Sequence, residues 1–277
     1  MRGCKLQGLG LAVAATFLVT SSVNATITDY ELLKLADYTQ TSDAQPTTLT
    51  EYSAVEQVVS SAGDFTSASF SGGGSSLTLP GSNGTFIAGQ IFSTKGALDA
   101  AVPNGTTFTF ALTGGTYGGQ TATVTSFATD QYPPSVPYLT GTTFDSLQNV
   151  NAAHPINLTF NSQPNGSSVI ISTSSGAVYS NFTLPASATS LLLPANTLQP
   201  GQTYQMDLLS GAIAATSGFT PPALGLMFQG DTTIVDFTTS RIAAPEFDPS
   251  SLAAGLTLLL GALAVLRGRW QRIDRAA

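Results

Sequence analysis

The chain has 277 residues, a formal net charge of −7 and only 9% charged residues. Between residues 26 and 249 there are three basic and fifteen acidic side chains, which gives a net charge of −12. Nucleic acid binding requires clustered lysine and arginine, so this composition excludes it and predicts repulsion from anionic surfaces.

The N-terminus has the three-part pattern of a secretory signal peptide. Arg2 and Lys5 form a basic start, an uncharged apolar run follows at 9–20, and small residues precede Ala25. We therefore expect signal peptidase to cleave between Ala25 and Thr26.

The single cysteine, Cys4, precedes the apolar run, whereas the cysteine of a lipoprotein would follow it. The mature chain is therefore expected to carry no lipid at this position, no thiol and no disulfide, although its route leads to an oxidising compartment. The length that remains between the two ends suits two ordinary domains or one large β domain.

Alternation of apolar and polar residues is the main pattern of the remaining chain. At 106–112, apolar side chains fall on one face of an expected strand and threonines on the other. Further expected strands lie at 30–38, where a helix fits about equally well, and at 156–160, 178–184, 203–208 and 234–237. Asn-Gly and Pro-Gly pairs between the strands predict turns.

These patterns predict a mainly β protein with two antiparallel β-sandwich-like domains. The run at 95–101, which ends before a proline, predicts a short helix among the strands. Three prolines at 132–138 preclude a central strand, so we place a domain boundary there. The expected organisation is a signal peptide at 1–25, a β domain with the short helix at 26–135, a second sandwich at 140–241 and a C-terminal segment at 242–277.

The second sandwich is expected to resemble immunoglobulin and fibronectin type III domains. Leu198, Pro200, Gly201 and Tyr204 have the form L-x-P-G-x-x-Y. In such sandwiches a tyrosine near the start of a late strand directs its hydroxyl to the backbone a few residues upstream, an arrangement called the tyrosine corner. We expect Leu198 to fill the core and Tyr204 to hold the turn.

Residues suited to catalysis are scarce. His154 is the only histidine, no G-x-S-x-G motif accompanies it, and a zinc site would need several histidine or cysteine ligands. No catalytic residue, metal site or cofactor is expected. A hydrolase with paired carboxylates is kept as an alternative, with candidates Asp29, Glu31, Glu51, Glu56 and Asp64 and with Glu51 and Glu56 as the pair to test.

A carbohydrate-binding module is a second alternative. Tyr132 and Tyr138 in the proline-rich segment could stack on a sugar, although tyrosines covering a domain junction are the more ordinary interpretation. Calcium binding in the loops has little support, because the chain lacks a D-x-D-x-D-G run.

The C-terminal segment combines an apolar run with a basic end. The run at 252–266 has no charge, and as a helix it would be roughly 22 Å long, shorter than the ~30 Å hydrocarbon layer of a bilayer. Arg267, Arg269 and Arg272 follow it, so after export they would stop translocation on the cytoplasmic side. We expect membrane association through this helix.

The same segment resembles the PEP-CTERM sorting signal of Gram-negative bacteria. That signal has a Pro-Glu-Pro motif, a transmembrane helix and an arginine-rich end. Pro245 and Glu246 match its start, Phe247 and Asp248 are interposed, and Pro249 resumes the pattern. The stretches 98–106 and 194–204 also look like parts of proteins that carry this signal.

The resemblance implies an exported, non-enzymatic protein of the cell surface or extracellular polysaccharide matrix. Its processing partners would be signal peptidase and a membrane protease of the exosortase type, with extracellular polysaccharide as a further partner. The chain would be membrane-associated before processing and would then move to the outer surface or matrix of a Gram-negative bacterium.

Overall fold

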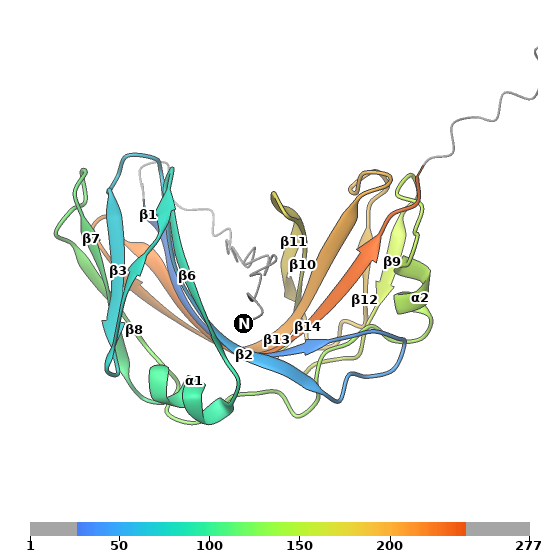
Figure 1. The fold of residues 1–277 in the computed structure, drawn as a ribbon, viewed down its shortest axis with the longest axis horizontal. Helices are drawn as coiled ribbons and strands as arrows, with labels where there is room; N and C mark the ends of the chain where they lie inside the picture. Colours follow the sequence, from blue (N-terminus) through green and yellow to red (C-terminus); the bar gives the residue numbers. More distant parts are fainter. Residues whose placement is uncertain (1–26, 242–277) are drawn as a thin grey trace, which may run out of the picture. The chain divides into compact units, whose positions relative to one another are not determined.

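A computed structural model describes residues 27–241, which form strands and two short helices within one compact unit that ends at Ser240 (Figure 1). The elements are β1 (Ile27–Thr39), β2 (Leu49–Ser60), β3 (Ser67–Gly72), β4 (Ser75–Leu79), β5 (Gly81–Ser82), β6 (Thr85–Phe92), α1 (Lys95–Ala101), β7 (Thr107–Thr113), β8 (Thr121–Thr125), α2 (Thr143–Leu147), β9 (Ile156–Thr159), β10 (Ser167–Thr173), β11 (Gly176–Leu184), β12 (Ser190–Leu193), β13 (Thr203–Gly218) and β14 (Ala223–Thr238).

The signal peptide, the sorting motif and the apolar helix expected at 252–266 lie outside the described residues. Within 27–241, no helix is long and apolar enough to cross a bilayer.

The main feature is one sheet of eight strands in the order β11-β10-β13-β14-β1-β2-β6-β5. β13 and β14 pair antiparallel over their whole length, from Thr203 opposite Thr238 to Gly218 opposite Ala223. β1 lies between β14 and β2; it is parallel to β14 and antiparallel to β2. Figure 1 shows these four long strands running side by side through the sheet. Two smaller sheets, β4-β3-β7-β8 and β12-β9, complete the fold.

This topology differs from the two separate antiparallel sandwiches that the sequence predicts. The strands on either side of the expected boundary belong to the same sheet, because β1 from the first range pairs directly with β14 from the second. The pair is also parallel, so the sheet is mixed. Proline-rich residues 132–138 do lack a strand, as expected, but they connect two parts of a continuous sheet.

Two hydrophobic cores lie on one face of the large sheet. The N-terminal core packs the four-stranded sheet and α1 against β1, β2, β6 and the start of β14, with Tyr30, Phe70 and Phe110 at its centre. The C-terminal core packs β9, β12 and α2 against β10, β13 and the end of β14, with Tyr204 and Phe237 among its members. Because side chains alternate along a strand, Leu33 and other residues of β1 point to the opposite face.

That opposite face carries a third, smaller cluster. Leu33 and Leu35 of β1 meet Phe228 of β14 there, together with Val55, Ile170 and Leu209. Residues on both faces of β1 are therefore buried, which is typical of strands with parallel neighbours.

Several local predictions are confirmed. Helix α1 covers residues 95–101 as expected, and the Thr94 hydroxyl caps it by accepting a hydrogen bond from the Ala97 N–H at 3.2 Å. Expected strands at 106–112, 156–160 and 178–184 correspond to β7, β9 and β11. The strands expected at 203–208 and 234–237 are the outer ends of the much longer β13 and β14.

A glycine allows the N-terminal core to close over β14. A Cβ atom placed on Gly225 would lie 2.3 Å from the Tyr30 Cζ atom, which is closer than real Cβ contacts. The Tyr30 ring can therefore lie across β14, where it also meets Phe110 and Phe219 edge-on at centroid distances of 5.5 and 5.1 Å.

Candidate functional site

The residues of the expected tyrosine corner lie together at the C-terminal core. The Tyr204 hydroxyl accepts a hydrogen bond from the Gln199 backbone N–H at 2.7 Å. Leu198 is 3% exposed and belongs to the C-terminal core, and the Tyr204 ring stacks on Phe237 at 5.6 Å. Gly201 has a φ of 71°, a left-handed conformation that glycine adopts without strain. The turn before β13 is thereby fixed to the core.

The same turn holds the end of β14. Thr239 forms an isolated parallel bridge with Val150, and the Ser240 N–H donates to the Val150 carbonyl at 2.8 Å. From the other side, the Thr239 hydroxyl donates to the Gln199 carbonyl at 2.6 Å, and the Gly201 N–H donates to the Ser240 carbonyl at 3.1 Å. We call these contacts the exit clamp, because the C-terminal segment follows directly.

An ion network that includes one buried lysine lies beside the N-terminal core. Lys34 of β1 is fully buried, and its Nζ atom lies 2.6 Å from Asp99 Oδ1 of α1. The same ammonium donates a hydrogen bond to Asn104 Oδ1 at 2.8 Å. A buried lysine needs such partners, since a charge removed from water without compensation is costly.

The network continues to the segment that leads into 132–138. Lys95 Nζ lies 2.6 Å from both Asp99 Oδ2 and Asp130 Oδ2. Asp130 Oδ1 also accepts hydrogen bonds from Asn104 at 3.0 Å and Gln229 at 3.2 Å. Burial alone would raise the pKa of Asp130, but the hydrogen bonds from Lys95, Asn104 and Gln229 outweigh it and lower that pKa to about 2. The network thus joins α1 and residue 130 to both β1 and β14.

The proline-rich segment 132–138 is fastened to the sheet. The Thr233 hydroxyl of β14 donates to the Pro137 carbonyl. The Gln40 side chain, 2% exposed, both donates to the Leu139 carbonyl and accepts from the Leu139 N–H, each at 2.9 Å. These contacts hold the segment in place against the sheet.

The two tyrosines considered as alternative sugar platforms lie in this proline-rich segment. Tyr132 and Tyr138 are both half-buried, and burial raises the pKa of Tyr132. Their partial burial favours a packing role.

Several carboxyl groups are buried in the large sheet. Burial raises the pKa of Asp29, Glu56, Asp207 and Asp231 to about 7 in each case. Burial likewise raises the pKa of Asp37 to about 6, although the Ser53 hydroxyl donates to its Oδ2 atom at 2.6 Å. These groups keep their protons to a higher pH in the folded protein than carboxyl groups in water do, so the stability of the sheet depends on pH.

The arrangement does not provide the carboxylate pair of the alternative hydrolase hypothesis. Glu51 and Glu56 are five residues apart on β2, so they point to opposite faces and lie roughly 16 Å apart along the strand. Carboxylates of glycosidases lie about 5–9.5 Å apart across a substrate. Asp29 and Glu31 are each 1% exposed, and Asp64 Oδ2 accepts from the Ser61 N–H at 3.1 Å in a loop.

The single histidine lies at the surface. His154 is exposed in the loop before β9, and its backbone N–H donates to the Asn151 carbonyl. No group of three or more histidine, cysteine, aspartate or glutamate side chains within 27–241 could hold a metal ion.

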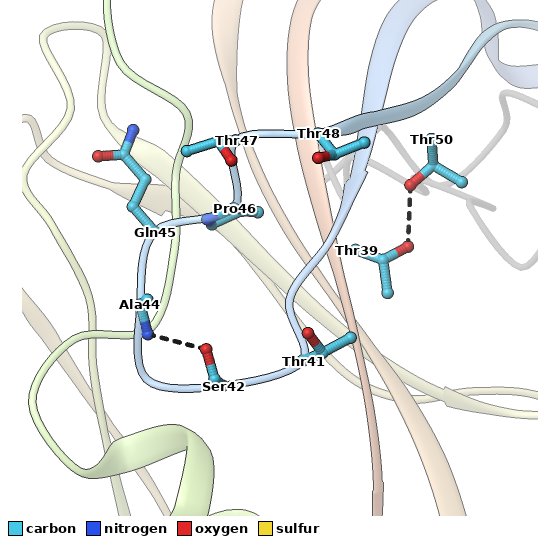
Figure 2. A pocket seen from close by; sticks show the side chains of 9 residues that line it. All are labelled: Thr39, Thr41, Ser42, Ala44, Gln45, Pro46, Thr47, Thr48 and Thr50. Atoms are coloured by element: carbon cyan, nitrogen blue, oxygen red, sulfur yellow. Dashed lines mark hydrogen bonds between the residues drawn. The ribbon is translucent and has the colours of Figure 1, made fainter.

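One polar hollow lies in the loop between β1 and β2. Its volume is about 380 Å³, and nine residues line it: Thr39, Thr41, Ser42, Ala44, Gln45, Pro46, Thr47, Thr48 and Thr50. Figure 2 shows the loop bending back on itself, with Thr39 and Thr50 joined by a hydrogen bond of 3.0 Å between their hydroxyl oxygens. We call this site the threonine hollow. It offers hydroxyl groups and no carboxylate or aromatic lining.

Neighbouring residues keep the loop of the threonine hollow in place. Gln40 fastens its start to Leu139, and Asp43 Oδ1 accepts from the N–H groups of Phe144 and Asp145 at 3.0 and 3.4 Å. Asp43 thereby caps the N-terminus of α2 from a distant part of the chain. The hollow is therefore supported from the C-terminal core.

The ion network and the threonine hollow were not expected from the sequence. Lys95 and Asp99 have the i, i+4 spacing of a helical ion pair, and Lys34 is the other lysine of the body, so a search for partners could have started there. The density of threonine at 39–50 was a comparable signal for the hollow.

Comparisons with known proteins add weak structural likenesses only. No protein-family model and no curated protein matches the sequence. A solved structure described as a biofilm associated protein BSP domain is 15% identical with a TM-score of 0.23, over 79% of this chain and 30% of that chain. The present chain thus spans less than a third of that structure.

Two further structures are similar at the same level. Chicken CNTN1 FN1-FN3 domains are 13% identical with a TM-score of 0.24, over 79% of this chain and 66% of that one. A structure titled for host cell surface retention of a 1.5-MDa bacterial ice-binding adhesin is 13% identical with a TM-score of 0.23, over 80% of this chain and 67% of that one. Similarity at these scores carries no argument about function.

Proposed function

We propose that this chain is an exported, non-enzymatic protein of the cell surface or extracellular matrix, sorted through its C-terminal segment. The observation that carries the proposal is the exit clamp. It fixes the end of the fold at Ser240, and four residues separate Ser240 from the Pro245-Glu246 motif. Four residues can span at most roughly 15 Å, a reach that would let a membrane protease meet the motif without unfolding the body.

The rest of the molecule is compatible with this role. Between the two terminal signals lies a β body whose lysines and buried carboxyls belong to structural contacts or to the interior of the sheet. The proposed partners are signal peptidase and an exosortase-type protease. The proposed route passes through the membrane of a Gram-negative bacterium to its outer surface or matrix.

The experiment is intact mass spectrometry of the protein from the cytosol, membranes, surface and medium of a host that has such a protease. We expect an N-terminus at Thr26 in all exported material and a C-terminus near Pro245 in surface or released material. Recovery of the protein from the cytosol with Met1 intact would overturn the proposal.

Substitutions in the sorting motif and in the folded body test the two parts of the proposal separately. Glu246→Ala should leave the C-terminal segment uncleaved and keep the protein in the membrane fraction. Asp236→Asn, an exposed change on β14, should be processed as the unmodified protein is. Replacing Arg267, Arg269 and Arg272 together by Gln should reduce retention before processing, because the membrane stop is removed.

The threonine hollow favours a second candidate function, binding of a neutral polysaccharide. Its lining of hydroxyl groups can donate and accept hydrogen bonds, as sugar hydroxyls do. Thr47→Val and Thr48→Val together remove two hydroxyls and preserve shape, so retention on an immobilised polysaccharide should fall. If the double variant and a Thr123→Val control on β8 are retained equally, the threonine hollow is excluded as the polysaccharide-binding site.

A further inference from the structure

The amine of Lys34 lies against a carboxamide as well as a carboxylate. Its Nζ atom donates to Asn104 Oδ1 at 2.8 Å and lies 2.6 Å from Asp99 Oδ1. The Lys34 side chain is fully buried, whereas Asn104 is exposed in the turn after α1. These groups are the nucleophile, the electrophile and the base of a transamidation, in which an amine displaces ammonia from a side-chain amide.

Hydrogen bonds hold the Asn104 carboxamide through both of its polar atoms. Its Nδ2 atom donates to Asp130 Oδ1 at 3.0 Å, while its Oδ1 atom accepts from Lys34. Lys95 lies 2.6 Å from both Asp130 and Asp99, which closes a ring of five side chains. The ring orients the carboxamide beside the amine, and such positioning strongly accelerates reactions between neighbouring groups.

The reacting atoms are close together in the folded chain. The side-chain carbonyl carbon of Asn104 is one C=O bond, about 1.2 Å, from the oxygen that Lys34 contacts. The Lys34 Nζ atom therefore lies at most about 4 Å from that carbon, close to the ~3–3.5 Å separation of a near-attack arrangement. Burial shields the amine from water, and the exposed side of Asn104 gives ammonia a way out.

We propose that Lys34 and Asn104 form an intramolecular isopeptide bond, with Asp99 as the general base. Asp99 takes a proton from the Lys34 ammonium, and the free amine attacks the side-chain carbonyl carbon of Asn104. A C–N bond forms to the lysine nitrogen, and the bond from that carbon to Nδ2 breaks. Both protons that the lysine nitrogen loses go to the departing nitrogen, which leaves as ammonium, so no other reactant is needed.

The ion pair is the state before this reaction. Burial alone would raise the pKa of Asp99, but hydrogen bonds from Lys34 and Lys95 outweigh it and lower that pKa. Proton transfer from the ammonium to Asp99 is therefore unfavourable at neutral pH, and the bond accumulates slowly after folding. Freshly purified protein still holds the ion pair.

Alkaline solution should speed the reaction, because it raises the fraction of free amine. Two further carboxyls, Glu56 of β2 and Asp231 of β14, face the same side of the sheet diagonally from Lys34 in the strand register. Burial raises the pKa of each to about 7, so both are ionised above pH 8, as are Asp99 and Asp130. A further rise in pH leaves the charge of these carboxyls unchanged.

The bond joins β1 covalently to the turn after α1. It closes a loop of chain between residues 34 and 104, which restricts the unfolded chain, so reacted protein should unfold at a higher denaturant concentration than unreacted protein. The proposal goes beyond the sorting route and is independent of it, because it uses only residues of the folded body.

Mass spectrometry of the purified full-length chain tests the bond. Incubation at pH 9 should give a species lighter by one ammonia, and its protease digest should contain one branched peptide that joins Lys34 to Asn104. An unchanged mass after prolonged incubation, or digests in which the two residues always occur in separate peptides, would overturn the proposal.

A second reaction can release ammonia from the same side chain. The backbone nitrogen of Gly105 can attack the Asn104 side-chain carbonyl carbon and give a succinimide, without any branched peptide. Asn83 and Asn165 also precede glycine, and neither hydrogen-bonds a lysine or arginine within 27–241, so they are matched internal controls. Equal loss of ammonia at all three pairs without a branched peptide would show succinimide formation only and would contradict the proposal.

Variants assign the roles. Lys34→Met removes the nucleophile, so it should form no branched peptide. Asp99→Asn keeps the shape and removes the base, so the bond should form at least about tenfold more slowly than in Asp145→Asn, a matched change at an exposed position of α2. Circular dichroism verifies folding of each variant, and equal rates for the two Asp→Asn variants would exclude Asp99 as the base. If Lys34→Met does not fold, the digest of the unmodified chain still decides whether the bond exists.

Discussion

The two hydrophobic cores stabilise the same sheet in different ways. The N-terminal core is rich in aromatic rings, with Phe70 stacked on Phe108 at 4.9 Å, and an ion network borders it. The C-terminal core is mostly aliphatic, and its loops are held by hydrogen bonds from neutral side chains such as Tyr204 and Thr239. Among the described residues, the ion pairs are thus at the N-terminal end, while neutral polar contacts and the Asp43 cap of α2 serve the C-terminal end.

The continuous strands link the two ends. β1 and β14 each contribute residues to the N-terminal core, and β14 also reaches the C-terminal core through Val235 and Phe237. Loss of packing in one core should therefore also weaken the other core, because the two cores share long strands of the same sheet.

The largest expected effect is loss of packing in the N-terminal core. Phe110 is fully buried and contacts Tyr30 and Phe70 edge-on, so Phe110→Ala should lower the free energy of unfolding by about 3–5 kcal/mol. Hydrogen exchange should show weaker protection at both cores in a single transition. Two separate thermal transitions, with the C-terminal core unaffected, would instead indicate independent ends.

The next effect concerns the ion network. Asp99→Ala leaves the buried Lys34 ammonium without its carboxylate and should cost about 3 kcal/mol in denaturant unfolding. Lys34→Met removes the buried charge itself and should cost much less, and the double variant should resemble Lys34→Met. Equal losses for Asp99→Ala and for the exposed Asp236→Asn would show that the network adds no stability.

The buried carboxyls predict that stability falls as pH rises. Their folded-state pKa values lie above the unfolded value near 4, so the folded protein binds more protons between about pH 4 and 7. The stabilisation is complete below pH 4 and is lost as pH rises through 7. At pH 8, Asp207→Asn should therefore raise the free energy of unfolding, measured by denaturant, by on the order of 2 kcal/mol. At pH 4 the variant and the unmodified protein should differ little.

The matched control for this pH effect is Asp236→Asn on β14. Asp236 is exposed, and its charge makes only the smallest of the contributions that raise the pKa of Asp207, so its substitution should change the pH profile much less than Asp207→Asn does. A melting temperature that rises between pH 5 and pH 8 in the unmodified protein would contradict the expected sign.

The smallest effect tests the neutral contacts of the C-terminal core. Tyr204→Phe removes the hydroxyl that the Gln199 N–H bonds and should cost about 1 kcal/mol. Tyr179→Phe, a partly buried tyrosine at the same core, should stay within about 0.5 kcal/mol of the unmodified protein. If Tyr204→Phe lowers the free energy of unfolding less than Tyr179→Phe does, the tyrosine corner does not stabilise the fold.

Local features of this protein follow from its sequence. Alternation over 106–112 and 178–184 indicated half-buried strands, because each has one face toward a core and the other toward solvent. The capped run at 95–101 indicated a helix, and the spacing of Leu198 and Tyr204 indicated a turn whose tyrosine reaches upstream backbone. Each of these patterns depends on residues close together in the chain.

The tertiary structure alone decided how the two halves combine. Burial of both faces of β1 and β14 removes the alternation that would reveal their length and pairing, so no local pattern distinguishes one mixed sheet from two sandwiches. The meeting of Lys34 with Asp99, and of Asp43 with α2, likewise depends on contacts between distant residues. The sequence indicated several of the strands, the α1 helix and the tyrosine turn, and it predicts the terminal signals, whereas long-range pairing determined the sheet and its buried charges.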